Sequence, residues 1–324
     1  MAEIKRVAVI GAGTMGHSIA AISLRGGLGV NLIDTSESIL RDAQDKIKKI
    51  LRTQIRAEDT LGPGPEANLV PNPNAKLDKV MSGLHTFLSL PDGVAGADFV
   101  IEAVPENLDL KKEIFQRLDV LCPPEVTLAS NTSGLPITSI AADLNHPARV
   151  VGTHFYMPAD IMPLVEVVRS EYSEQEAVDT TVDLLRFLKK KPVVVNKDIP
   201  GFIGNRLQHA IAREALFMLD RGVASARDID DVVRYTLGLR FLHTGPLEQR
   251  DLNGLDIALN IAEYLYPDLE DSKEPPTILK EKVASGMLGL KSGQGLFDWS
   301  GTSQEEVMAR KSEKLEKLLE LMES

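Results

Sequence analysis

The sequence predicts an α/β fold: a doubly wound N-terminal domain over residues 1–196, followed by an all-α C-terminal domain over residues 197–324. Three observations predict it. Short apolar runs alternate with helical stretches up to residue 195, which is typical of a largely parallel sheet. A glycine-spaced turn follows the first of these runs directly. After Pro200, helical spacing alone continues.

The elements follow in order. Strands are expected at Val7–Ile10, Val30–Ile33, Phe99–Val104, Thr127–Ser130, Val150–Thr153, Leu164–Val168 and Val193–Val195. Helices are expected at Met15–Arg25, from Ser36 onward, and at Phe202–Arg221, Ala226–Leu237, Gly254–Tyr266, Thr277–Ser285 and Glu305–Met322. The last helix carries an apolar stripe, which predicts core or subunit packing. Residues 61–77 have Pro and Gly at spacings that break both periods. We expect an exposed excursion there, either an active-site cover or a plain surface loop.

The segment VAVIGAGTMGH, residues 7–17, joins a strand to a phosphate-binding type of turn. Gly11 permits the tight turn, Gly13 lets the backbone approach a pyrophosphate, and Gly16 lets the helix pack closely on the sheet. Asp34 ends the next strand about twenty residues later, where a carboxylate accepts from a ribose 2'-hydroxyl and repels a 2'-phosphate. The alternative is an ordinary turn with Asp34 as a helix cap. We interpret the segment as a Rossmann-type site for NAD rather than NADP, formed by Gly11, Ala12, Gly13, Thr14, Met15, Gly16 and Asp34.

A histidine and a glutamate on neighbouring apolar strands are the candidates for acid–base chemistry. Glu166 stands among four apolar residues in LVEVV, and burying a lone carboxylate is costly unless it has a partner. His154 ends the preceding strand. A carboxylate on one imidazole nitrogen makes the other a better base for an alcohol proton. Ser133 and Asn205 could bind a substrate oxygen. The alternative is that the histidine, the glutamate and these two residues have ordinary structural roles.

Composition excludes several classes of protein. The formal net charge of −11 disfavours a general nucleic-acid or anionic-membrane binder. No metal-ligand pattern is identified. The single Cys122 excludes an intrachain disulfide, and we expect it to be a small buried hydrophobe. The first strand begins by Val7, and no apolar run has membrane-spanning length, so we expect no signal peptide, no membrane span and a cytoplasmic location.

Several motifs occur together in order: GAGTMG, EAVPENLDLKKEIF, SNTSG, HF-x-x-P, LVEVV, PGF-x-x-NR and KSGQGLFDW. In this order they resemble the 3-hydroxyacyl-CoA dehydrogenase family over nearly the whole chain. The resemblance implies NAD as hydride acceptor, an L-3-hydroxyacyl substrate oxidised to the 3-keto product in fatty acid metabolism, and a homodimer. It implies that His154 is the general base with Glu166 as its partner, that Ser133 and Asn205 bind the reacting oxygen, and that Glu106, Lys111 and Asn131 line the NAD site.

Two departures from the family pattern bear on the substrate. Met157 replaces the asparagine usual three residues after the histidine, and Ile50 and Ala57 stand where CoA-specific members commonly carry serine and lysine. A basic stripe at Lys48, Arg52 and Arg56 could bind CoA phosphates or could be a solvated face. Other stretches resemble relatives that act on small free acids: gulonate and carnitine dehydrogenases, lambda-crystallin and a pyridine-carboxylate dehydrogenase. The substrate is therefore a CoA thioester or a free hydroxy acid.

The residues also bear on two other classes of protein. A β-hydroxyacid dehydrogenase would carry a catalytic lysine in the segment that here reads GFIGNRLQHA, which has none. A crystallin-like protein would bind NAD without useful turnover, but every expected catalytic position is filled in this chain.

Overall fold

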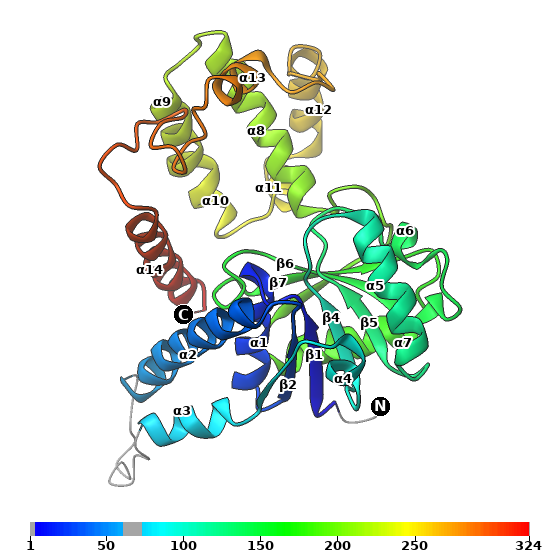
Figure 1. Ribbon diagram of the computed structural model, residues 1–324. Helices are drawn as coiled ribbons and strands as arrows, with labels where there is room; N and C mark the ends of the chain where they lie inside the picture. Colours follow the sequence, from blue (N-terminus) through cyan, green and yellow to red (C-terminus); the bar gives the residue numbers. More distant parts are fainter. Residues whose placement is uncertain (1–3, 61–72, 324) are drawn as a thin grey trace. The chain divides into compact units, whose positions relative to one another are not determined.

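A mixed, mainly parallel sheet organises the first part of the chain. The computed structural model describes residues 4–60 and 73–323. The strands are β1 (Arg6–Ile10), β2 (Gly29–Ile33), β3 (Leu84–Phe87), β4 (Phe99–Glu102), β5 (Thr127–Ser130), β6 (Val150–Phe155), β7 (Leu164–Arg169) and β8 (Lys191–Val195). Their order in the sheet is β3-β2-β1-β4-β5-β6-β7-β8. The first six strands therefore have the Rossmann order, which confirms the predicted fold class (Figure 1).

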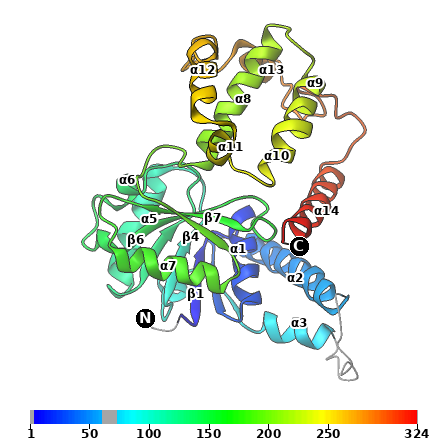
Figure 2. The same ribbon diagram turned by 180° about the vertical axis from the view of Figure 1, so that it is seen from behind.

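Helices cover both faces of this sheet. They are α1 (Thr14–Arg25), α2 (Glu37–Thr60), α3 (Pro73–Met81), α4 (Leu90–Val94), α5 (Leu108–Leu121), α6 (Ile137–Ala141) and α7 (Gln175–Phe187), with the short 3-10 turn η2 (Pro147–Arg149). Residues of α1, α2, α3 and α7 form one core cluster with the sheet, and residues of α4, α5 and α6 form another. Figure 2 shows α1 and α7 in front of the sheet. The alternating apolar strands are thus buried on both sides, as the near-continuous Val, Ile and Leu runs require.

One strand pair is antiparallel. All other neighbours run parallel, but β6 and β7 pair antiparallel. In their register His154 lies directly opposite Glu166, so both side chains project from the same face of the sheet.

The chain divides into two compact units, residues 1–205 and 206–324. The second unit is helical over its described residues. Its elements are the rest of α8 (Gly204–Asp220), α9 (Ala226–Val232), the π-helical turn η3 (Val233–Gly238), α10 (Leu239–Phe241), α11 (Pro246–Asn253), α12 (Leu255–Leu265), α13 (Thr277–Ala284) and α14 (Gln304–Glu323). The predicted helix at Ala226–Leu237 is therefore α-helical only in its first part.

Three details of the predicted elements were wrong. The prediction had no strand at Leu84–Phe87, which forms the edge strand β3. The strand begun at Phe99 ends at Glu102, where the chain turns toward the site, rather than at Val104. Residues 73–77 are not an exposed loop, because they open α3, where Leu77 is buried in the core. The rest of the expected 61–77 excursion, residues 61–72, lies outside the described residues.

The structure also confirms the expectation for Cys122. Cys122 is buried, and burial raises the pKa of its thiol, so it is a packed hydrophobe and not an activated nucleophile. Within the described residues, no helix is both long and apolar enough to cross a bilayer.

Candidate active site

The glycine turn has the backbone geometry that its sequence predicts. Gly11 has φ +93°, and a Cβ there would lie 2.7 Å from the carbonyl oxygen of Ala103. A Cβ at Gly16 would lie 1.7 Å from the carbonyl oxygen of Gly11, because α1 starts in contact with the turn. A Cβ at Gly13 would meet nothing within 4 Å. Gly11 and Gly16 are therefore required by the fold, whereas Gly13 borders open space, as a pyrophosphate site requires.

Asp34 is fixed beside this turn. Its carboxylate accepts hydrogen bonds from the backbone N–H of Ala12 at 2.9 Å and of Ser36 at 3.2 Å. It also lines a cavity of about 730 Å³ at the carboxyl ends of the central strands, a volume in the range of small-molecule sites. The carboxylate thus ties the glycine turn to the end of β2 and faces the space where a ribose would lie.

The cavity is a continuous, mainly apolar space with a few polar groups. The sequence-predicted cofactor residues that line it are Gly11, Gly13, Thr14, Met15, Asp34, Glu106 and Asn131, with Ser133 at the same wall. Beyond Asp34 the wall is apolar, with Leu88, Leu90, Leu110 and Ile114, and also includes Arg117. Leu110, Ile114 and Arg117 are spaced to share one face of α5.

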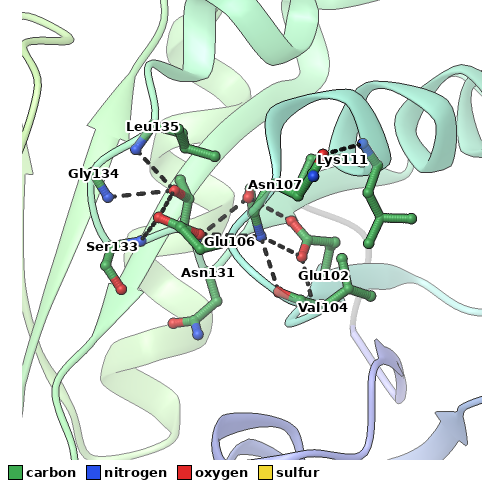
Figure 3. Close-up of polar contacts among 12 residues, drawn as sticks. Glu102, Val104, Glu106, Asn107, Lys111, Asn131, Ser133, Gly134 and Leu135 are labelled. Atoms are coloured by element: carbon green, nitrogen blue, oxygen red, sulfur yellow. Dashed lines mark hydrogen bonds and ion pairs between the residues drawn. The ribbon is translucent and has the colours of Figure 1, made fainter. Parts of the chain in front are cut away.

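Glu106, which lines the cavity, and the buried Lys111 belong to one polar network (Figure 3). The Glu106 carboxylate accepts from the Thr132 hydroxyl at 2.6 Å and the Ser133 backbone N–H at 2.9 Å. Lys111 Nζ lies 2.6 Å from a Glu102 oxygen and 3.5 Å from a Glu106 oxygen. Lys111 is fully buried, and it is not among the described residues that line the cavity. A place for Lys111 along the NAD site stays a prediction; in the structure the lysine holds the Glu102 and Glu106 carboxylates in place.

His154 and Glu166 form the expected pair. His154 Nδ1 lies 2.7 Å from Glu166 Oε2, and both side chains are buried. Burial alone would raise the pKa of Glu166, but hydrogen bonds from His154, from the backbone N–H groups of Ile203 and Gly204, and from Tyr156 lower it below its ordinary value. An ionised carboxylate only accepts hydrogen bonds, so Nδ1 carries the proton. Nε2 is then the nitrogen that can accept a proton from a substrate.

Asn131 connects this pair to the cavity. Its side-chain oxygen accepts from the backbone N–H of Phe155, the residue after His154, at 3.0 Å. Asn131 also lines the cavity. The cavity wall is therefore adjacent to the strand end that carries the histidine.

The segment 202–205 contacts the other candidate groups. The ring of Phe202 packs on His154 with centroids 5.8 Å apart, and Asn205 Nδ2 donates to the Ser133 carbonyl oxygen at 2.6 Å. Phe202 has φ +50°, a left-handed conformation that costs free energy in a residue with a large side chain. It directs the next two N–H groups, of Ile203 and Gly204, to one oxygen of Glu166 at 2.9 and 3.0 Å. Ser133 and Asn205 are thus neighbours, as a shared oxygen-binding site would require.

The basic stripe and the family departures all lie in the first unit. Lys48, Arg52 and Arg56 are exposed on α2. Ile50, on the same helix, packs against the core cluster rather than facing a ligand, and Met157 is 57% exposed. Ala57 lies in α2.

Sequence reasoning missed Glu102, Thr132, Tyr156 and the N–H groups of Ile203 and Gly204. The signal for Glu102 was present: a carboxylate ends an apolar strand, which is the same pattern that predicted a partner for Glu166. The backbone donors had no sequence signal, because their direction depends on the conformation of Phe202.

A glycine turn with open space at Gly13, an aspartate at the end of β2 and a buried histidine–glutamate pair define an NAD-dependent dehydrogenase that acts on a CH–OH group. The family models agree. The 3-hydroxyacyl-CoA dehydrogenase NAD-binding domain matches residues 6–199, and the C-terminal domain of the same family matches residues 201–299. The chain belongs to the 3-hydroxyacyl-CoA dehydrogenase family.

Two kinds of enzyme are among the proteins to which the chain is similar. A 5-formyl-3-hydroxy-2-methylpyridine 4-carboxylate 5-dehydrogenase of Mesorhizobium japonicum is 33% identical and covers 99% of both chains. A probable 3-hydroxybutyryl-CoA dehydrogenase of Bacillus subtilis is 38% identical over 92% of this chain and 98% of its own. A solved structure of a dehydrogenase for the same pyridine acid has a TM-score of 0.86 at 32% identity, covering 99% of both chains. The (S)-3-hydroxybutyryl-CoA dehydrogenase of Ralstonia eutropha has a TM-score of 0.73 at 33% identity, covering 92% and 100%.

Proposed function

We propose that the chain oxidises the hydroxyl of an L-3-hydroxyacyl substrate to the 3-keto product, with His154 as general base. The observation that carries this proposal is the 2.7 Å contact between His154 Nδ1 and Glu166, across a strand pair whose end adjoins the cavity. Residues 1–196 act as the NAD-binding domain and residues 197–324 as the substrate and dimerisation domain.

The cofactor site suits NAD. Gly13 leaves room for the pyrophosphate, Asp34 holds the ribose hydroxyls, and Glu106 and Asn131 contribute to the wall nearer the histidine. When bound, NAD accepts the hydride that leaves the substrate carbon. The carboxylate at Asp34 disfavours a 2'-phosphate, so we expect NAD to be preferred over NADP.

Side chains of the protein accept and return the proton of the substrate hydroxyl. Nε2 of His154 takes the hydroxyl proton, and the Glu166 carboxylate stabilises the resulting imidazolium through Nδ1. Ser133 and Asn205 hydrogen-bond the reacting oxygen as its charge changes. In the reverse direction the imidazolium returns the proton, so reduction is favoured at lower pH and oxidation at higher pH.

A second candidate is a small free hydroxy acid without CoA, of gulonate, carnitine or pyridine-carboxylate type. Ile50, which is partly buried against the core cluster, stands where CoA-specific members commonly have serine. The pyridine-carboxylate relative also matches 99% of the chain, whereas the family models end at residue 299, before α14. For the CoA candidate, the exposed Lys48, Arg52 and Arg56 would receive the CoA phosphates.

Matched initial-rate assays separate the two candidates. NADH-dependent reduction of acetoacetyl-CoA is measured beside a panel of free keto acids that includes dehydrocarnitine and 3-dehydrogulonate. Turnover confined to the thioester, reduced by charge-neutral substitution of Lys48, Arg52 and Arg56, supports the CoA substrate. Turnover confined to a free acid means that the family chemistry is kept without CoA recognition. If no panel member is turned over, the proposed reaction is wrong.

We further propose a cytoplasmic homodimer, acting in fatty acid metabolism if the substrate is a CoA thioester. A buried free thiol at Cys122 is compatible with a reducing compartment. The many exposed apolar side chains of the helical unit support the dimer.

A further inference from the structure

The carboxylate of Glu166 is shared between two side chains. Its Oε2 atom accepts from His154 Nδ1 at 2.7 Å and from the Tyr156 hydroxyl at 2.8 Å. Its Oε1 atom accepts the two backbone N–H groups of Ile203 and Gly204. Glu166 is 2% exposed, so these four protein donors take the place of water. The histidine and the tyrosine therefore donate hydrogen bonds to the same carboxylate oxygen.

Tyr156 is held close to the pair by packing. Its ring centroid lies 4.4 Å from that of His154. A Cβ at position 204 would lie 1.8 Å from the tyrosine hydroxyl oxygen and 2.7 Å from its Cζ. The hydroxyl reaches Glu166 only because residue 204 is glycine. Burial and the hydrogen bond to Glu166 raise the pKa of Tyr156, so the hydroxyl stays protonated as a donor across the neutral range.

We propose that Tyr156 is a positioning residue that sets the pH range of the reaction by weakening the hold of Glu166 on the His154 imidazolium. The proposal rests on the proposed function of His154 as general base. A donor on Oε2 withdraws negative charge from the carboxylate and so reduces the attraction that this oxygen exerts on a charged imidazole. Tyr156 thereby disfavours the imidazolium and leaves Nε2 of His154 ready to accept the substrate proton.

Few other groups around His154 and Glu166 could weaken the attraction between the carboxylate and the imidazolium. Within the described part of the chain, Tyr156, which directly follows β6, is an ionisable side chain that contacts both His154 and Glu166. The segment after β8 contributes the two N–H groups and the uncharged ring of Phe202. From β5, Asn131 faces the backbone beside His154 and is not ionisable.

The test is Tyr156→Phe, which keeps the ring and removes the hydroxyl. The acid limb of the kcat/KM profile for oxidation is expected to move to higher pH, by roughly half a unit or more, with NAD affinity unchanged. Tyr172→Phe, at a tyrosine 40% exposed on the surface, is the matched control and keeps the wild-type limb. A Tyr156→Phe profile that coincides with wild type, or that loses rate without moving, overturns the proposal.

A second variant tests the same hydrogen bond from the other side. Gly204→Ala should displace the tyrosine hydroxyl and move the limb in the same direction. In the double variant the limb should move no further than in Tyr156→Phe alone, because both changes remove one interaction. Fully additive shifts would contradict a common cause.

A measurement without substrate separates this inference from the proposed function. The His154 ring is titrated by NMR in the NAD-free protein, with its signal assigned through His154→Gln among the six histidines. A titration that moves to higher pH in Tyr156→Phe supports the inference even if no hydroxy acid is turned over. Coincident titrations refute it even if the enzyme is active.

Discussion

At the scale of single residues, the site depends on glycines, because at several positions a Cβ would clash with neighbouring atoms or enter the space of the cofactor. Three glycines in GAGTMG have different neighbours: close backbone at Gly11 and Gly16, open space at Gly13. The sequence motif predicted these separate roles, because each follows from where a Cβ could point. The same kind of argument failed at Gly204, whose role depends on Tyr156, a residue far from it in the sequence.

Alanine at Gly13 and alanine at Gly16 should differ in their effect on stability. Gly13→Ala is expected to keep the wild-type melting temperature and to weaken NAD binding tenfold or more, by occupying the pyrophosphate space. Gly16→Ala should also lower the free energy of unfolding, by about 1–3 kcal/mol, because its Cβ would overlap the turn. Calorimetry gives both quantities. Equal stability of the two variants would contradict the assigned roles.

At the scale of elements, the strand pair β6–β7 brings the predicted acid–base residues together. The sequence supplied a reason for a partner of Glu166, but not the antiparallel register that places His154 opposite it. Apolar periodicity located most strands of the sheet. It missed β3, which is half-buried at the sheet edge, and the start of α3, where prolines and glycines nearby obscured the helical pattern.

The connection between β6 and β7 is fixed by a half-buried lysine, Lys190. Lys190 Nζ donates to the carbonyl oxygens of Ala159 and Met162 at 2.6 and 2.9 Å. Burial lowers the pKa of Lys190 to about 8, with Asp160 opposing the shift. The unfolded chain therefore binds more protons than the folded chain between pH about 8 and the ordinary value near 10.5.

Stability should consequently rise with pH across this window. We expect the free energy of unfolding in urea to increase between pH 7.5 and 9.5 by on the order of 1–2 kcal/mol more in wild type than in Lys190→Met. Lys197→Met, at an exposed lysine, should keep the wild-type dependence. The same pH dependence in Lys190→Met and wild type would contradict this assignment.

At the scale of the whole molecule, the helical unit exposes many large apolar side chains, and extended exposed apolar patches are typical of interaction surfaces. Helices α8, α11, α12 and α13 contain no buried residue within the described chain. On α12, Leu255 and Leu259 are 63% and 59% exposed and lie one turn apart. The sequence predicted helices with apolar faces, but composition alone could not show which faces remain uncovered.

We expect a second copy of the chain to bury these exposed apolar faces in a dimer interface. Light scattering should give twice the 35.4 kDa chain mass. Leu255→Glu combined with Leu259→Glu should shift the protein toward monomer, because the charges would be buried in the interface. Val120→Glu, at a residue 79% exposed on α5 of the first unit, should not. A wild-type monomer at micromolar concentration would contradict the dimer.

The central claim is that His154, held by Glu166, moves the substrate proton, and His154→Gln tests it most directly. On whichever acid proves to be the substrate, turnover should fall by roughly 10²–10⁴, while the dissociation constant for NAD stays at the wild-type value. His85→Gln, at an exposed histidine of β3, should behave as wild type in both measurements. Undiminished turnover in His154→Gln would remove the histidine from the mechanism.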